Sequence, residues 1–218
     1  MPGREGPAVA QRPAMTVAGI LLAAGGGRRF GGPKALIEHD GQLLVETGAR
    51  LLLRSGCTPV VAVVGAGADE VVRRARLDPA DVVVNPDWKE GIGSSLRAGL
   101  KALADRSGVE AAVVALCDQP RVGPDAVGRL VAAWGGGSPV AVATFGGRPR
   151  NPVLLDRRLW ADVAALAQGD TGARAFLRAH PELVTTVECG DVASEADIDT
   201  PDDLALLSEE PERGVTCN

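Results

Sequence analysis

The sequence predicts an α/β fold: a doubly wound, three-layer α/β/α domain built on a mostly parallel sheet. Through the first 145 residues, short apolar runs alternate with longer amphipathic segments, as strands and helices do in such a fold. Aromatic residues make up only 3% of the chain and tyrosine is absent, so Ala, Val and Leu must fill the core. Small aliphatic side chains suit helices that pack on a parallel sheet.

The predicted strands are apolar runs bounded by glycine, proline or polar residues. The run PVVAVV stops at Gly65, and the run AAVVAL ends at Cys117 and Asp118. Continuous apolar runs of this length are typical of strands that are buried on both faces of a sheet. We predict strands at residues 17–22, 59–64, 82–84, 111–116, 140–145 and 152–155, and an edge strand at 183–189.

The predicted helices carry apolar residues at helical spacing. Leu96, Leu100 and Leu103 fall on one face of a helix that Ser94 or Ser95 is expected to cap. The final helix has proline in its first turn, where a missing N–H costs no hydrogen bond. We predict helices at residues 44–54, 68–76, from 94 or 95 onward, 124–134, 157–167, 172–179 and 201–207.

Length and charge predict one domain without a basic face. The chain has 218 residues, and we expect a disordered leader at 1–15, a single domain at 16–208 and a flexible tail at 209–218. The 23 Lys and Arg residues against 28 Asp and Glu residues give a net charge of −5, which argues against a nucleic-acid or anionic-membrane partner. No apolar run approaches the roughly 18 residues of a membrane span.

Cysteine and histidine usage argues against a zinc site. The two histidines, His39 and His180, lie far apart, and none of the four cysteines forms a Cys-x-x-Cys pair. Cys57 and Cys117 lie among apolar residues, which favours reduced thiols and a cytoplasmic protein, although an even number of cysteines leaves disulfide pairing as an alternative.

The glycine-rich segment AAGGGRRFGGPK, at residues 23–34, is the strongest sign of a ligand site. Backbone N–H groups that lack a neighbouring Cβ can approach an anion closely. Arg28, Arg29 and Lys34 add three cations, which favours a polyphosphate, with an ordinary flexible turn as the alternative. A dinucleotide-binding loop is disfavoured because Gly65 stands where an acidic residue would hold the ribose, and the Walker pattern is absent.

Two acidic segments could hold a metal ion beside such a phosphate. Asp118 directly follows an apolar strand, so its carboxylate is expected at the carboxyl edge of the sheet, where it could bind Mg²⁺ together with phosphate oxygens. Capping of the next turn is the alternative for Asp118. Asp199 precedes a proline-initiated helix, and a helix N-cap is its alternative role.

Five segments together resemble a known family. They are the glycine loop at 23–34, GIGSSL at 91–96, LCDQP at 116–120, GDTGAR at 169–174 and DIDTPDDL at 197–204. In this order they resemble the nucleotidyltransferase family of MobA and MocA, nearest to its molybdenum cofactor cytidylyltransferase branch, over about residues 17–207. The resemblance implies a Rossmann-like fold of the nucleotide-diphospho-sugar transferase type. It also implies transfer of CMP from CTP to a phosphorylated acceptor, molybdopterin cofactor, with release of pyrophosphate.

The resemblance also assigns roles to individual residues. It implies that the nucleotide is bound by Ala23, Ala24, Gly25, Gly27, Arg29, Lys34 and Ser95. It implies that the catalytic residues are Arg29, Lys34 and Asp118, and that Mg²⁺ is bound by Asp118 and Asp199. Plain N-capping is the alternative role for Ser94 and Ser95. Trp88 could stack on a ring or anchor a loop.

The acceptor is expected to bind at Arg148, Asn151, Asp170 and Arg174. Asn151 departs from the family's histidine, so it keeps hydrogen bonding but loses the proton chemistry of the ring. A molybdoenzyme is the expected recipient of the product. Ala23-Ala24 favours CTP, because the guanylyl branch usually has Gly-Gly there. The alternatives are a guanylyltransferase, a cytidylyltransferase of another phosphate ester, and a non-catalytic carrier or chaperone of the molybdenum cofactor.

Overall fold

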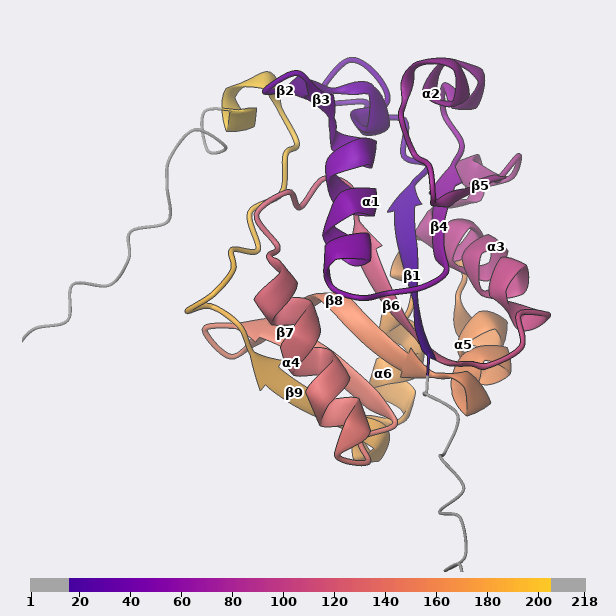
Figure 1. Ribbon diagram of the computed structural model, residues 1–218, viewed down its shortest axis with the longest axis vertical. Coiled ribbons are helices and arrows are strands. Elements are labelled where there is room, and N and C mark those ends of the chain that lie inside the picture. The colour runs from indigo at the N-terminus through magenta and orange to yellow at the C-terminus, as the bar shows by residue number, and fades with distance from the viewer. Residues whose placement is uncertain (1–15, 205–218) are drawn as a thin grey trace, which may run out of the picture.

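A seven-stranded sheet forms the centre of the computed structural model, which describes residues 16–204 (Figure 1). The strands lie in the order β5-β4-β1-β6-β8-β7-β9. Their bounds are β1 Thr16–Ala23, β4 Val60–Val64, β5 Asp81–Val84, β6 Val109–Leu116, β7 Val140–Phe145, β8 Arg148–Asp156 and β9 Val184–Glu188. The short strands β2 (Glu38–His39) and β3 (Gln42–Leu43), which the sequence pattern did not reveal, form a separate hairpin.

The sheet is mostly parallel, as predicted. Only β8 runs antiparallel to its neighbours β6 and β7, while the other paired strands are parallel. β9 pairs only with β7 and forms one edge of the sheet, which confirms the predicted edge strand. β8 begins four residues before its predicted start at residue 152, because Gly146 and Gly147, with φ of 57° and 77°, turn the chain directly from β7 into β8.

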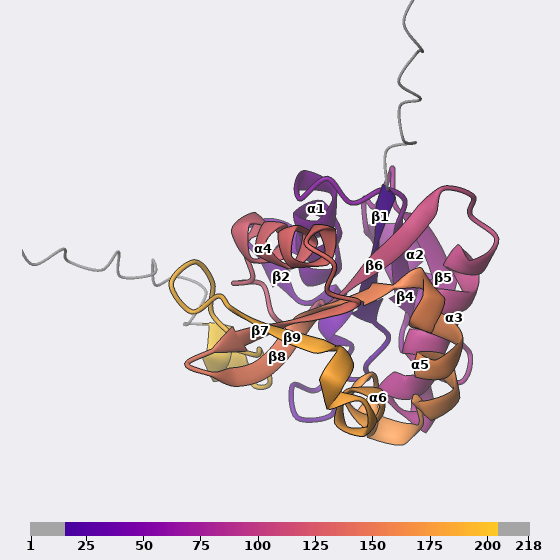
Figure 2. The ribbon, with the colours of Figure 1, turned by 90° about the horizontal axis from the view of Figure 1, so that it is seen from below.

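Helices cover both faces of the sheet, which confirms the three-layer arrangement (Figure 2). On one face lie α1 (Leu44–Arg54) and α4 (Pro124–Gly135); on the other lie α3 (Ile92–Ala104), α5 (Trp160–Leu166) and α6 (Arg174–Ala179). Successive residues of β1 point to opposite faces, so Leu21 packs in the first layer and Ile20 in the second. The short helix α2 (Ala68–Arg74) contributes Val71 to the first layer.

Several helix boundaries differ from the predicted ones. α3 begins at Ile92 with Gly91 as its N-cap, and not at a serine cap. The segment expected as one helix at 157–167 is a 3₁₀ turn followed by α5, and α6 begins two residues late because Gly172 has a φ of 52°. The described part of the last helix, Pro201–Leu204, is a 3₁₀ turn. The predicted leader and tail lie outside the described residues.

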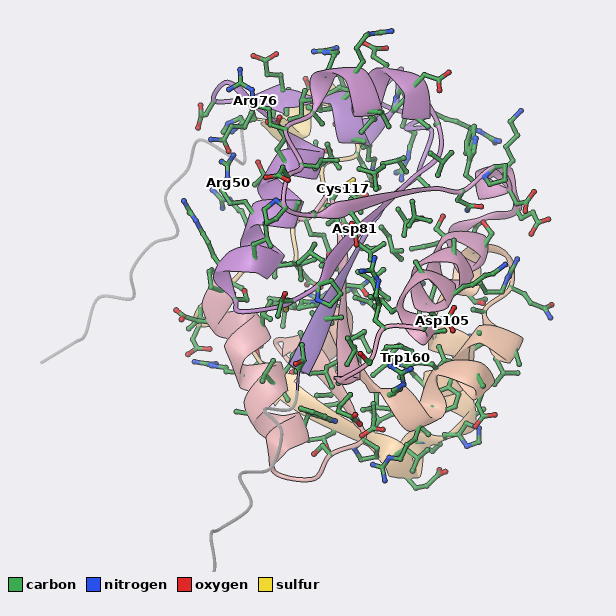
Figure 3. The ribbon with its side chains drawn as sticks, turned by 45° about the vertical axis from the view of Figure 1, so that its right-hand side comes forward. Arg50, Arg76, Asp81, Asp105, Cys117 and Trp160 are labelled. Carbon is green, nitrogen blue, oxygen red and sulfur yellow. The ribbon has the colours of Figure 1, made fainter. Side chains whose placement is uncertain are left out.

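Apolar side chains gather inside the molecule, and charged side chains lie toward its outside. Cys117 lies inside the molecule where β6 ends, whereas Arg50, Arg76 and Asp105 lie toward its outside (Figure 3). The described cysteines, Cys57, Cys117 and Cys189, are buried and free. Between residues 16 and 204, no helix is long and apolar enough to cross a membrane.

Candidate functional site

The glycine loop after β1 is a tight turn organised by Gly27. The carbonyl oxygen of Gly27 accepts hydrogen bonds from the backbone N–H groups of Phe30, Gly31 and Gly32 at 3.0, 2.9 and 3.3 Å. Gly27 has a φ of 56°, and a Cβ at this position would lie 1.9 Å from the carbonyl oxygen of Gly32. Only glycine fits there, so Gly27 shapes the loop, while Gly25 and Gly26 face a cavity.

Lys34 joins two carboxylates from distant parts of the chain. Its Nζ lies 2.8 Å from Oδ2 of Asp118 and 2.5 Å from Oδ1 of Asp199, and Nη2 of Arg29 lies 2.8 Å from Oδ2 of Asp199. Burial lowers the pKa of Lys34, but the hydrogen bonds and charges of the two carboxylates outweigh it and raise that pKa above its ordinary value. Lys34 is therefore a fixed cation, and the residues predicted for catalysis and metal binding lie together.

Backbone contacts hold the two carboxylates in place. The N–H of Ile198, a fully buried residue, donates to the carbonyl oxygen of Asp118 at 2.8 Å, which fixes the second acidic segment beside the end of β6. Oδ2 of Asp203 accepts the backbone N–H groups of Asp199 and Thr200 at 2.9 and 2.7 Å. Asp203 thus does the local capping, and the carboxylate of Asp199 faces Lys34 instead.

A cavity of about 400 Å³ opens beside this cluster. Trp88 lines it and also packs under the glycine loop, because a Cβ on Gly26 would lie 3.0 Å from its ring. Trp88 therefore both anchors the loop and borders the cavity. Of the residues predicted to bind nucleotide, three do not line the cavity: Ala23 is buried within β1, Gly27 forms the turn, and Arg29 pairs with Asp199. The polar and glycine-loop residues that do line it are Ala24, Gly25, Gly26, Arg28, Lys34, Lys89, Ser95, Asp118 and Asp170.

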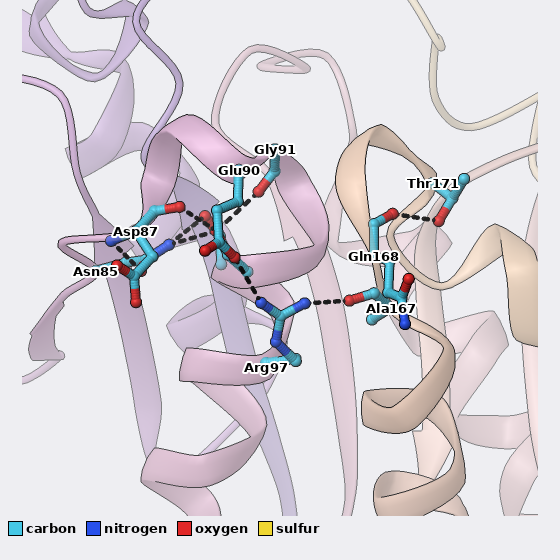
Figure 4. A network of polar contacts seen from close by, with 10 residues as sticks. Asn85, Asp87, Glu90, Gly91, Arg97, Ala167, Gln168 and Thr171 are labelled. Atoms are coloured by element: carbon cyan, nitrogen blue, oxygen red, sulfur yellow. Dashed lines mark hydrogen bonds and ion pairs between the residues drawn. The ribbon is translucent and has the colours of Figure 1, made fainter.

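A buried asparagine that the sequence pattern did not single out fixes the serines of this cavity. Nδ2 of Asn85 donates to Oγ of Ser94 and of Ser95 at 2.9 and 3.1 Å, and Oδ1 of Asn85 accepts the N–H of Asp87 at 3.0 Å (Figure 4). The proposed N-capping by the serines is wrong, because Gly91 is the N-cap and has no side chain to cap with. One signal was available: Asn85 directly follows the apolar residues that end β5.

A second cavity of about 380 Å³ adjoins the first. Leu22, Ile92 and Leu116 line both cavities, so the two share a wall at the carboxyl ends of β1 and β6. Two of the residues predicted for the acceptor, Asn151 and Arg174, lie in this second cavity.

The other two predicted acceptor residues lie elsewhere. Arg148 lines neither cavity, because its side chain turns outward and Nη2 lies 3.0 Å from Oε1 of Glu195. Asp170 lines the first cavity instead of the second, because its turn packs against Gly91, where a Cβ would lie 2.6 Å from Oδ1 of Asp170. Arg150, which pairs with Glu195 at 2.7 Å, lines the second cavity instead.

Arg97 connects α3 to the segment at residues 167–171 that carries Asp170. Arg97, on α3, donates to the carbonyl oxygen of Ala167 and to Oε2 of Glu90, the latter at 3.0 Å (Figure 4). The hydroxyl of Thr171 donates to the carbonyl oxygen of Gln168 at 2.7 Å. These bonds hold the segment that carries Asp170 against the start of α3, where the two cavities meet.

Comparisons with known proteins identify the family. The model of the MobA-like NTP transferase domain matches residues 19–184. Nicotine blue oxidoreductase of Paenarthrobacter nicotinovorans is 42% identical over 88% of this chain and 96% of its own. Molybdenum cofactor guanylyltransferase of Rhodobacter capsulatus is 36% identical over 61% of this chain and 64% of its own. Rv0371C of Mycobacterium tuberculosis H37Rv, solved as a complex with manganese, has a TM-score of 0.71 at 27% identity over 88% of this chain and 97% of its own. The chain therefore belongs to the MobA-like NTP transferase family, the nucleotidyltransferases that its five motifs resemble.

Proposed function

We propose that this protein is a cytoplasmic, Mg²⁺-dependent nucleotidyltransferase that moves CMP from CTP to the phosphate of a small organic acceptor and releases pyrophosphate. The observation that carries the proposal is the cluster of Lys34, Asp118 and Asp199 beside two adjoining cavities. One cavity is bordered by the glycine loop and would hold the nucleotide. The other would hold the acceptor, so that its phosphate meets the nucleotide at the shared wall.

In this reaction, an oxygen of the acceptor phosphate attacks the α-phosphorus of CTP. The bond from that phosphorus to the β-phosphate oxygen breaks, and pyrophosphate leaves with its electron pair. A phosphate monoester is already anionic near neutral pH, so the step depends on positioning and charge neutralisation more than on a general base. Lys34 and Arg28 line the nucleotide cavity and would bind the triphosphate, with Arg29 close by on Asp199.

Asp118 and Asp199 would hold the metal ion. Within the described residues no group of three or more potential ligands occurs, but Mg²⁺ is commonly held by one or two carboxylates together with substrate phosphates. The two carboxylates already share the ammonium group of Lys34, so their position favours a cation. When bound, the ion would neutralise charge on the phosphate oxygens. The manganese complex of Rv0371C supports a divalent ion in the family.

CTP is the nucleotide we propose. Ala24 and Ser95 both line the first cavity, as expected for residues that contact the base and the ribose. Asn85 donates to the oxygen of Ser95, which leaves the hydroxyl proton of Ser95 for an acceptor atom on the nucleoside.

Molybdopterin cofactor is the proposed acceptor, and a molybdoenzyme is the proposed recipient of the product. Arg174 supports an anionic acceptor, because it lines the second cavity and makes no ion pair with another described residue.

Pyrophosphate release tests the proposal. The purified protein is incubated with Mg²⁺ and each of the four nucleoside triphosphates, with and without molybdopterin. Acceptor-dependent release should be at least about tenfold faster with CTP than with GTP, ATP or UTP, the discrimination expected when a few pocket contacts differ. Equal rates with all four nucleotides would refute the choice of base. No release from any of them would refute nucleotidyl transfer.

The similarity to nicotine blue oxidoreductase favours a second candidate function, oxidation or reduction of a related compound. The second cavity would then hold that compound and the first a nicotinamide nucleotide. A dinucleotide ribose usually binds an acidic side chain at the end of the second strand. That strand is followed here by Gly65, where a Cβ would lie 2.5 Å from Cβ of Trp88, so no larger residue fits. Consumption of NADH or NADPH in the presence of nicotine blue would favour the oxidoreductase over nucleotidyl transfer.

A further inference from the structure

Gln119 has a buried carbonyl oxygen without a partner. The residue follows Asp118 directly, is only 4% exposed and lines the second cavity. Its Oε1 accepts no hydrogen bond from any residue in the described part of the chain. Buried polar atoms in proteins are nearly always hydrogen-bonded, so such an atom in a cavity wall indicates a donor on a ligand. Neither the sequence pattern nor the proposed reaction assigns a role to Gln119.

The orientation of the Gln119 amide follows from its neighbour. The side chain of Gln119 interacts with the carboxylate of Asp197, which also lines the second cavity. A carboxylate accepts hydrogen bonds and does not donate them, so the NH₂ group of Gln119 must face Asp197. This orientation leaves Oε1 as an acceptor. The cavity therefore presents two acceptors side by side, the amide oxygen of Gln119 and the carboxylate of Asp197.

The rest of the cavity can contact both the faces and the polar edge of a ring. Aliphatic side chains form part of its wall, and two cationic side chains, Arg150 and Arg174, also line it. Cavities that combine apolar side chains with a few placed polar groups are typical binding sites for small organic molecules. The aliphatic side chains that line it are those of Leu22, Ile92, Leu96, Val114, Leu116, Val142, Val153 and Leu177.

We propose that Gln119 determines acceptor specificity: its Oε1, beside the carboxylate of Asp197, accepts a hydrogen bond from an amino group that lies next to a ring N–H on a flat nitrogen heterocycle. This inference rests on the proposed function for the role of the second cavity as the acceptor site. A ligand with a carbonyl oxygen at that edge would face two acceptors, so the site rejects it. In this arrangement Gln119 recognises the ring of the acceptor by a hydrogen bond. Asp118, one position earlier, would lie near the phosphate of the acceptor that reacts.

Two isosteric probes test this recognition without any transfer reaction. Pterin carries an amino group beside a ring N–H, and lumazine has a carbonyl oxygen in place of that amino group. Binding of each to the full chain is measured by probe fluorescence without nucleotide. The wild-type protein should bind pterin roughly 10- to 100-fold more tightly than lumazine, the range expected when a buried polar group loses its partner. Equal affinity for the two probes, or no binding of pterin, overturns the proposal without any variant.

Gln119→Met keeps the length of the side chain and removes the acceptor, so it should bring the two affinities within about threefold of each other. Gln168→Met is the matched control, because Gln168 is exposed and does not line the second cavity; it should keep the wild-type preference. Unchanged affinity for Mg²⁺-CTP shows that Gln119→Met is folded. A Gln119→Met protein that retains the full preference overturns the proposal.

The outcome also separates this inference from the proposed function. A pterin preference that depends on Gln119, in a protein that releases no pyrophosphate, keeps the recognition and refutes the transfer reaction. Acceptor-dependent pyrophosphate release whose KM and kcat are unchanged in Gln119→Met keeps the transfer reaction and overturns the recognition. A specificity role predicts that KM for the acceptor rises while KM for CTP stays constant.

Discussion

Nζ of Lys34 lies 2.5 Å from Oδ1 of Asp199, although 165 positions separate the two residues in sequence. A third charge, Asp118, accepts from the same ammonium group. The site therefore balances cationic side chains against the two carboxylates. A bound metal ion and triphosphate would divide these partners, with the metal ion on the carboxylates and the lysine on the phosphate.

Replacement of Lys34 should separate metal binding from catalysis. In Lys34→Met the two carboxylates lose the cation that they share, so affinity for Mn²⁺ without nucleotide should rise by at least about threefold. Turnover should fall by roughly 100-fold, the usual effect of losing one charge-stabilising group. Calorimetry and pyrophosphate release measure the two effects. Lys101→Met, on the exposed side of α3, should change neither, and weaker Mn²⁺ binding by Lys34→Met would contradict the shared-cation arrangement.

Asp118→Asn distinguishes an enzyme from a carrier of the same fold. The amide has nearly the shape of the carboxylate but lacks its charge, so turnover should fall about 100- to 1,000-fold while binding of CTP stays measurable. Asp105→Asn, at the exposed end of α3, is the matched control and should keep the wild-type rate. A full rate in Asp118→Asn would exclude this residue from the metal site.

Gly27→Ala tests the geometry of the glycine loop. The new Cβ would overlap the carbonyl oxygen of Gly32 at 1.9 Å and would force a left-handed φ of 56° on alanine. We expect affinity for Mg²⁺-CTP to fall at least about tenfold, because the backbone N–H groups of the loop must move. Gly32→Ala, whose Cβ would meet nothing within 4 Å, should bind normally. Equal losses in both variants would show that the turn at Gly27 has no special role.

Asn85→Ala should affect both stability and nucleotide binding. The variant loses the hydrogen bonds to Ser94 and Ser95 in a buried place, which should lower the free energy of unfolding by about 1–3 kcal/mol. Ser95 contacts the nucleoside in the proposed complex, and its hydroxyl is no longer held in place in the variant. The substitution should therefore raise KM for CTP by a larger factor than it lowers kcat. Urea unfolding and steady-state kinetics measure these changes. An unchanged KM would mean that Asn85 acts on stability alone.

Glu188 should make stability depend on acid pH. Hydrogen bonds from the backbone N–H groups of Gly147 and Gly190 and from the side chain of Thr144, with a smaller one from Gly146, lower its pKa from 4.5 to about 2. A lowered pKa means that the stabilisation is complete above pH 4.5 and is lost as the pH falls toward 2. Glu188→Gln should therefore lower Tm at pH 7 and differ progressively less from the wild type below pH 4.5.

The control for Glu188 is Glu110→Gln, an exposed glutamate on β6. Its Tm should follow the wild type at every pH. A constant difference between Glu188→Gln and the wild type from pH 7 to pH 2 would contradict the role of the charged carboxylate.

Local features of the sequence predicted much of the fold and part of the site. Apolar runs revealed the strands, because a strand that is buried on both faces needs an apolar residue at each position. The glycine loop was recognisable because Gly27 and its cations stand close together in sequence. Asn85 was missed because a single polar residue after a strand does not show which side chains it will meet. Arg148 and Asp170 do not line the second cavity for a related reason: their contacts, Glu195 and Gly91, are far away in the sequence.

The sequence by itself determined the strands, the glycine loop with its three neighbouring cations and the family, since all of these depend on residue types at short spacing. Only the tertiary structure decided which carboxylates share Lys34, which side chains line each cavity and that Oε1 of Gln119 has no partner. These features depend on where separate strands end on one sheet edge. Which strand ends lie side by side is decided by strand order and packing, and no short stretch of sequence specifies either of these.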